Sequence, residues 1–278
     1  MKFQQHKVEL PESKITMSYQ EANPAASPTF ILLHGLRSNA TVSKHLGRHL
    51  KGIHLVMIDI PGYGQSDPLP SVHSLENLAK AVDEFIGVQG YKNVVLAGHS
   101  FGGTVAFATA HHFPEKLDRL VLVTPALKQS SRFMSVAKNY YKFYAKLPES
   151  LQRALLTNFI IVRLISRWLL HSKHPAMRNQ YMEYAMSSSH QINPRTVAEV
   201  AVDMIDSELQ QQVAGFAKPT LLIGAEHDTL TPPDSLRQLA DQMKNAEYQQ
   251  MSDVGHLPPI EKPEELSQLI LKHLEENK

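Results

Sequence analysis

The sequence of 278 residues contains no cysteine, and neither sign of charge prevails. Without cysteine the chain can form no disulfide, no thiolate metal site and no iron–sulfur cluster, and any covalent nucleophile must be an oxygen or a nitrogen. The 28 basic and 27 acidic side chains give a formal net charge of +1, and no long run of like charges occurs. Nucleic acid is therefore not an expected partner.

Long apolar runs are also missing. The most apolar stretch, Leu155 to Leu170, contains Arg163 and Arg167 and is shorter than the roughly 20 residues that a membrane span needs. The first ten residues alternate polar and apolar side chains and lack the apolar core of a signal peptide. We therefore expect a cytoplasmic protein without a transmembrane segment, either a monomer or a homodimer.

Short runs rich in Val, Ile and Leu alternate with longer stretches of helical period. This alternation predicts an α/β fold with a mostly parallel sheet covered by helices, because parallel strands are buried on both faces. The expected strands are Thr29 to Leu33, Leu55 to Asp59, Val94 to Ala97, Leu120 to Val123, Thr220 to Ile223 and Glu247 to Met251. A hairpin from Lys7–Leu10 and Lys14–Tyr19 adds two edge strands and completes eight, and Pro263 to Glu276 is expected to form the last helix.

The alternation stops between residues 126 and 212, where no strand is expected. This segment is rich in aromatic residues and carries eleven Lys and Arg against six Asp and Glu, a net charge of +5. We expect residues 1–125 and 213–278 to form the core domain and residues 126–212 to form a helical insertion. Within it the Leu155–Leu170 stretch predicts an amphipathic helix, and Tyr140, Tyr141, Phe143 and Tyr144 predict either an aromatic pocket wall or the core of the insertion.

A Gly-x-Ser-x-Gly pattern, Gly98 to Gly102, stands between an expected strand and an expected helix. A serine at the apex of so sharp a turn leaves no room for side chains two positions before and after it, so glycine is required there. The turn exposes the Ser100 hydroxyl above the sheet at the positive end of a helix, where developing negative charge is favoured. This context predicts a nucleophile.

Serine needs a base, and the base needs an acid that orients it. Two later strands end in turns that carry such groups: Glu226-His227-Asp228 follows one, and Asp253-Val254-Gly255-His256 follows the other. With His34-Gly35, the Asp59 to Ser66 segment and Glu261-Lys262-Pro263-Glu264, these turns make the sequence resemble the α/β-hydrolase superfamily over nearly its whole length. That family orders its triad as Ser, then Asp or Glu, then His.

The resemblance implies a role for each matching residue. Ser100 is the expected nucleophile, His256 the base, and Asp228 the group that orients His256. The family's oxyanion hole consists of two backbone N–H groups, which fall here on Leu36 and Phe101. The family also inserts a helical cap after the sixth strand of the sheet, so that residues 126–212 are expected to form a lid over the site.

Other titratable residues near these turns are alternatives to the triad. Glu226 is a possible orienting acid in place of Asp228, although the family pattern favours the aspartate. Asp253 is expected to shape its turn rather than to orient the histidine. His99 and His34 are expected to pack and to brace their loops, and neither is included among the catalytic residues.

No cofactor is expected. The Gly62-Tyr63-Gly64-Gln65 segment matches neither a P-loop nor a dinucleotide fingerprint. The His171-x-x-His174 spacing places two imidazoles on one helix face, but no third ligand stands at motif spacing nearby. We therefore expect no metal.

A serine nucleophile narrows the reaction, because dehalogenases and epoxide hydrolases of this fold carry aspartate at that position. The expected enzyme is a serine hydrolase that forms an acyl-enzyme, a carboxylesterase for short to medium lipophilic acyl esters. A thioesterase or a carbon–carbon bond hydrolase with the same triad is an enzymatic alternative. A non-catalytic receptor that binds a small molecule in the same pocket is the alternative from another class.

Overall fold

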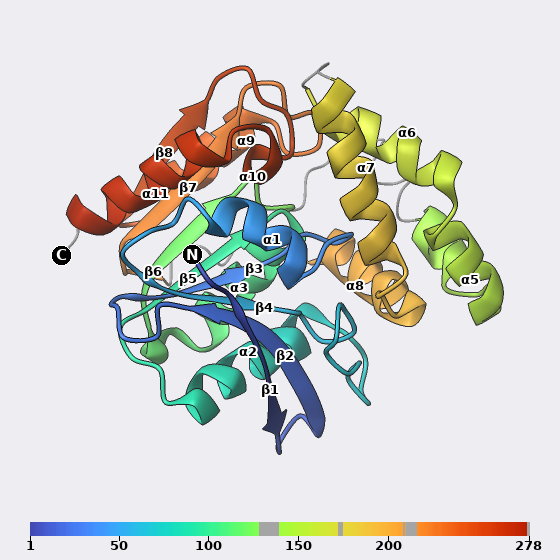
Figure 1. The fold of residues 1–278 in the computed structure, drawn as a ribbon, viewed down its shortest axis with the longest axis horizontal. Coiled ribbons are helices and arrows are strands. Elements are labelled where there is room, and N and C mark those ends of the chain that lie inside the picture. Colours follow the sequence, from blue (N-terminus) through green and yellow to red (C-terminus); the bar gives the residue numbers. More distant parts are fainter. Residues whose placement is uncertain (128–138, 172–174, 208, 210–215, 277–278) are drawn as a thin grey trace.

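A computed structural model describes residues 1–278 except 128–138, 172–174, 208, 210–215 and 277–278 (Figure 1). An eight-stranded sheet of order β1-β2-β4-β3-β5-β6-β7-β8 forms its centre. The pairs β1–β2 and β2–β4 are antiparallel and the others are parallel, as expected from the sequence. The strands are β1 (Gln4–Leu10), β2 (Ile15–Ala22), β3 (Thr29–Leu33), β4 (His54–Ile58), β5 (Val94–His99), β6 (Leu117–Val123), β7 (Thr220–Ala225) and β8 (Ala246–Met251).

Helices cover both faces of this sheet. On one face α2 (Leu75–Gln89), α3 (Phe101–His112) and α9 (Pro233–Gln242) pack against alternate strand residues such as Ile31 and Leu33. On the other face α1 (Ala40–Gly47) and α11 (Pro263–Glu276) pack against the residues between them, such as Phe30 and Leu32. The period of two along each strand thus supplies two hydrophobic layers. Two short helices, η1 (Pro114–Lys116) and α10 (Pro258–Glu261), precede β6 and α11.

Helices lie between β6 and β7, gathered to the right of the sheet in Figure 1, and four of them are described over their full length. They are α5 (Glu149–Leu156), α6 (Phe159–Leu169), α7 (Pro175–Ser189) and α8 (Pro194–Asp206). The prediction of a single helix over Leu155–Leu170 is wrong. The first helix ends before Thr157, and a second helix begins after Asn158. The Asn158 side chain accepts hydrogen bonds from the backbone N–H groups of Ile160 and Ile161 and so caps α6. Among the described residues, no helix combines the length and the apolar character needed to cross a bilayer.

A buried histidine ties α8 to the loop that precedes α2. Glu199 accepts hydrogen bonds from the backbone N–H of His73 at 2.9 Å and from its Nδ1 at 2.7 Å, while His73 Nε2 accepts from the N–H of Leu69 at 2.9 Å. An imidazole that donates through one nitrogen and accepts through the other is neutral. Burial accordingly lowers the pKa of His73 although a carboxylate faces it. This contact joins the helical segment to the core through a carboxylate and a neutral ring.

Glu199→Gln is expected to lower the free energy of unfolding by about 1 to 3 kcal/mol, because the two His73 donors and the Arg195 Nε–H, which donates to Glu199 Oε1 at 2.7 Å, lose a charged acceptor. Glu149→Gln provides the matched control, since Glu149 forms only an exposed pair with Arg153 at 3.7 Å, which contributes about 0.5 kcal/mol or less. Urea unfolding of both variants measures the difference. Equal costs for the two substitutions would contradict this role of Glu199.

Candidate active site

Ser100 occupies the turn between β5 and α3. Its backbone adopts φ 53° and ψ −119°, a conformation that L residues rarely adopt. The close packing expected from the glycine pattern is present: a Cβ on Gly98 would lie 2.1 Å from the carbonyl oxygen of Gly102, and one on Gly102 would lie 2.3 Å from the carbonyl oxygen of Leu33. Only glycine fits at both positions, and the turn therefore lifts the serine above the sheet.

The structure brings Ser100, His256 and Asp228 into one hydrogen-bonded chain. Ser100 Oγ lies 2.8 Å from His256 Nε2, and His256 Nδ1 lies 2.8 Å from Asp228 Oδ2. A carboxylate only accepts hydrogen bonds, so Nδ1 is the donor and Nε2 of the neutral ring is left to accept from the serine hydroxyl. In this tautomer His256 can take the proton from Ser100.

The Asp228 carboxylate is held by its own loop as well as by His256. Its Oδ1 accepts from the N–H groups of Leu230 and Thr231 at 2.8 and 2.9 Å, and its Oδ2 accepts from the Thr231 hydroxyl at 2.5 Å. Burial disfavours the ionised form, but the charge and hydrogen bond of His256 and the bonds from Thr231 outweigh it, so that the pKa of Asp228 is lowered. Asp228 is therefore ionised at neutral pH. Thr231 does not belong to the sequence motif that identifies Asp228.

Thr231→Val is expected to lower the free energy of unfolding by about 1.5 to 3 kcal/mol near pH 7, because one bond to the buried carboxylate is lost. A lowered folded-state pKa contributes stability above the ordinary aspartate pKa of about 4, and this contribution disappears as the pH falls through the folded-state pKa. The cost should therefore shrink on acidification. Thr109→Val is the control, since the Thr109 hydroxyl donates to the Val105 carbonyl at 2.8 Å, and its cost should not change with pH. A pH-independent cost at Thr231 would contradict the assignment.

The two backbone groups expected to bind an oxyanion lie beside Ser100. Phe101 is the first residue of α3, and the first N–H groups of a helix have no intrahelical acceptor. Leu36 follows Gly35, whose own Cβ would lie 3.7 Å from Ser100 Cβ. Both residues line the same cavity as Ser100 and His256. A carbonyl oxygen placed there would lie at the positive end of α3.

His34 and His99 are structural in this geometry, as the sequence predicts. His34 Nδ1 donates to the Gly35 carbonyl at 2.9 Å and Nε2 accepts from the N–H of Ile60 at 3.1 Å, which fixes the loop that carries Leu36. His99 Nε2 donates to the carbonyl oxygen of His256 at 2.8 Å. Burial and the charge of His256 lower the pKa of His99 to about 3, so that this ring stays neutral beside the catalytic candidates.

The alternative acids lie elsewhere. The Glu226 carboxylate accepts a hydrogen bond from the Asp253 N–H at 3.0 Å and closes the turn before His256. Asp253 has φ 50° and belongs to that turn. Among the described residues the partner of His256 Nδ1 is Asp228 alone.

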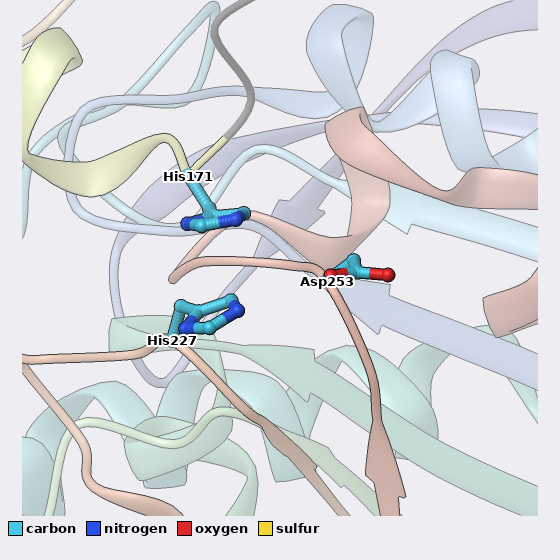
Figure 2. Close-up of side chains that lie close together, drawn as sticks. All are labelled: His171, His227 and Asp253. Atoms are coloured by element: carbon cyan, nitrogen blue, oxygen red, sulfur yellow. The ribbon is translucent and has the colours of Figure 1, made fainter.

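A second group of titratable side chains lies close to the Asp228 and His256 turns. His171, His227 and Asp253 place one ligand atom each within 4.8 Å of one another (Figure 2). The two rings stack face to face, with centroids 3.8 Å apart and planes 18° from parallel. Parallel rings direct their lone pairs alongside each other rather than toward one point, so one ring would have to turn before both could bind a common ion. His174, the partner expected from sequence spacing, lies outside the described residues.

A cavity of about 580 Å³ opens over Ser100 and His256. Apolar side chains form most of its wall, and α6 contributes Leu164, Ile165, Trp168 and Leu169. Of the aromatic cluster expected at this place, Tyr140 and Tyr141 line the cavity, whereas Phe143 is 62% exposed. Residues of the inserted segment thus line the same cavity as the candidate nucleophile.

A mostly parallel eight-stranded sheet with serine, aspartate and histidine on the turns after β5, β7 and β8 defines the hydrolases of the α/β class. The chain belongs to the alpha/beta hydrolase family, whose model matches residues 28–263. It is an enzyme of the hydrolase class, as its relatives are.

Known proteins similar to the chain carry hydrolase names. Lipase 1 of Psychrobacter immobilis is 23% identical over 88% of this chain and 76% of its own. A thermophilic esterase from Thermogutta terrifontis has a TM-score of 0.81 and 22% identity, with 98% of each chain covered. The enol-lactonase of Burkholderia xenovorans has a TM-score of 0.82 and 16% identity, with 97% of this chain and all of its own covered. At these identities the structural likeness shows the fold.

Proposed function

We propose that the protein is a serine hydrolase that cleaves a carboxylic ester, with Ser100, His256 and Asp228 as its catalytic triad. The observation that carries the proposal is the hydrogen-bonded chain from Ser100 Oγ through His256 to Asp228, with 2.8 Å at each step. A serine hydroxyl is a weak nucleophile until a base of this kind removes its proton. A pocket that only binds a ligand does not need a serine, a histidine and an aspartate hydrogen-bonded in this order.

The proposed reaction has two steps. Ser100 Oγ attacks the ester carbonyl while His256 Nε2 takes its proton, and the N–H groups of Leu36 and Phe101 bind the oxyanion. His256 then gives the proton to the leaving alkoxide, which departs as the alcohol and leaves an acyl-enzyme. Water, deprotonated by His256, hydrolyses the acyl-enzyme to the carboxylic acid and restores Ser100. Throughout, ionised Asp228 stabilises the imidazolium.

The cavity supports lipophilic acyl groups of short to medium length, because its wall is mostly apolar and its volume of about 580 Å³ is limited. The names of the relatives agree with ester chemistry, since they include a lipase, an esterase and a lactonase. We also propose that residues 126–212 act as a cap, because α6 forms part of the cavity wall.

Hydrolysis of p-nitrophenyl esters of increasing acyl length tests this proposal. We expect kcat/KM to pass through a maximum at one chain length. Each added methylene gains binding free energy by burial against the apolar wall until the cavity is full. No hydrolysis at any length would exclude a simple esterase. Acyl thioesters and a diketone substrate would then separate a thioesterase or a carbon–carbon hydrolase from a receptor, which would turn over none of them.

A further inference from the structure

The mostly apolar wall of the cavity contains one residue with a permanent charge. Arg37 follows Leu36 directly, and it is the only Lys, Arg, Asp or Glu among the described residues that line the cavity. Arginine carries its positive charge on a planar guanidinium. A half-buried cation in an apolar wall is costly unless an anion or several acceptors compensate it.

The described residues provide hydrogen-bond acceptors for only some of the N–H groups of this guanidinium. Nη2 donates to the carbonyl oxygen of Leu156 and to Ser189 Oγ at 3.4 Å. Among the described residues, Nε is buried without a hydrogen-bond partner, and Arg37 forms no ion pair with a carboxylate of that part of the chain. Buried polar atoms without partners are rare in proteins and indicate a missing water or ligand.

The titratable groups of the described residues that interact electrostatically with Arg37 include several phenols. Tyr141 and Tyr181 line the cavity, and the buried hydroxyl of Tyr63, a residue packed against Phe101, likewise has no partner in the described part of the chain. Burial raises the pKa of Tyr141, and it raises that of Tyr181 to about 12, although the charge of Arg37 opposes both shifts. These hydroxyls are therefore neutral at physiological pH, and they provide no counter-charge.

We propose that Arg37 determines substrate specificity by binding a carboxylate that the ester substrate carries in addition to its scissile bond. This inference rests on the proposed esterase function and narrows its substrate class to half-esters and other esters with a free carboxylate. The flat guanidinium presents several N–H donors in a fork that matches a carboxylate. A carboxylate is favoured over a phosphate, since its single charge balances Arg37, whereas a phosphate brings about −1.5 to −2 into an apolar cavity.

Arg37 also contacts the inserted segment, so its test must separate specificity from anchoring. The Arg37 carbonyl accepts a hydrogen bond from Ser188 Oγ at 2.8 Å in addition to the side-chain bonds to Leu156 and Ser189. Loss of an anchor would weaken the hydrolysis of every ester alike. Loss of a carboxylate subsite would weaken the hydrolysis of anionic esters and spare neutral ones of the same length.

The experiment compares mono-p-nitrophenyl adipate with p-nitrophenyl hexanoate, which have equal acyl length and differ in a terminal carboxylate. Arg37→Met is expected to lower the ratio of their kcat/KM values by about 10- to 100-fold, mainly through KM. Arg153→Met is the matched control, because Arg153 lies on the inserted segment, in an exposed pair with Glu149, and it should keep the wild-type ratio. A second pair, the butyrates of 4-hydroxybenzoic acid and of its amide, places the carboxylate on the alcohol side. If the ratio of kcat/KM values is unchanged in both pairs, including the case in which both members of each pair lose activity equally, the proposal is overturned.

Calorimetric titration of the wild-type protein with adipate and with adipamide needs neither turnover nor a stable Arg37 variant. We expect adipate to bind at least tenfold more tightly than adipamide, and equal or undetectable binding of both would overturn the proposal. Hydrolysis of the hexanoate ester without any preference for adipate refutes the carboxylate subsite alone. No hydrolysis of any ester, with Ser100 inert toward a fluorophosphonate, refutes the proposed function instead.

Discussion

Ser100→Ala is expected to lower kcat/KM for the best p-nitrophenyl ester by about 10⁴- to 10⁶-fold. The substitution removes the oxygen that lies 2.8 Å from His256 Nε2 in the turn between β5 and α3, and no acyl-enzyme can then form. The residual rate should be that of substrate held next to the oxyanion hole and attacked by water. Initial rates over the whole acyl series measure the loss.

Two controls make this result specific. Circular dichroism and the melting temperature of Ser100→Ala should match those of the wild type, because the substitution deletes a single oxygen. Ser235→Ala changes a serine on α9 that does not line the cavity and should keep full activity. A fall of less than about tenfold for Ser100→Ala would place the nucleophile elsewhere.

Asp228→Asn is expected to reduce kcat by about 10⁴-fold, the size found when the orienting acid of a serine protease is made neutral. The carboxylate can only accept a hydrogen bond from His256 Nδ1, whereas an amide can also offer its NH₂ to that nitrogen. The ring then carries its proton on Nε2 and cannot deprotonate Ser100. The protein should remain folded, since the side chain keeps its shape.

Glu226→Gln tests the rival acid with the same chemical change two residues away. Its carboxylate accepts from the Asp253 N–H, and an amide oxygen can still do so, and for that reason activity should fall by less than about threefold. A large loss at Glu226 combined with a small one at Asp228 would reverse the assignment. Each variant therefore replaces one carboxylate by an amide, and the two positions are only two residues apart.

Much of the sheet could be predicted because its strands are continuous apolar runs that end in turn residues. β3 has the bounds expected, and β4 runs over His54–Ile58 instead of ending at Asp59. Asp59 lies beyond the strand because its carboxylate accepts from the N–H groups of Ala40 and Gln65, at 2.8 and 3.0 Å. Because these donors are not sequence neighbours of Asp59, the residues around Asp59 do not indicate where the strand ends.

The helices between β6 and β7 were less predictable. The apolar period continues across Thr157 and Asn158, and only the cap formed by the Asn158 side chain shows where α5 and α6 separate. The last helix, α11, has the expected bounds, because Pro263 fixes its start. A local stop or start signal therefore predicts helix ends better than hydrophobic period does.

The candidate site was predictable where its residues follow parallel strands, since the carboxyl ends of such strands meet at one edge of a sheet. Ser100, Asp228 and His256 are of this kind. Thr231 and Arg37 are not, because their importance comes from contacts with side chains and carbonyl groups that only the folded chain brings near. Asp228 is bound by Thr231 through both backbone and hydroxyl.

Labelling with a fluorophosphonate, followed by mass spectrometry of the digested protein, tests whether His256 activates Ser100. We expect one adduct per chain, located on Ser100, and loss or strong slowing of this labelling in folded His256→Ala. An unlabelled Ser100 in folded wild-type protein, or labelling at the same rate without His256, would contradict this activation.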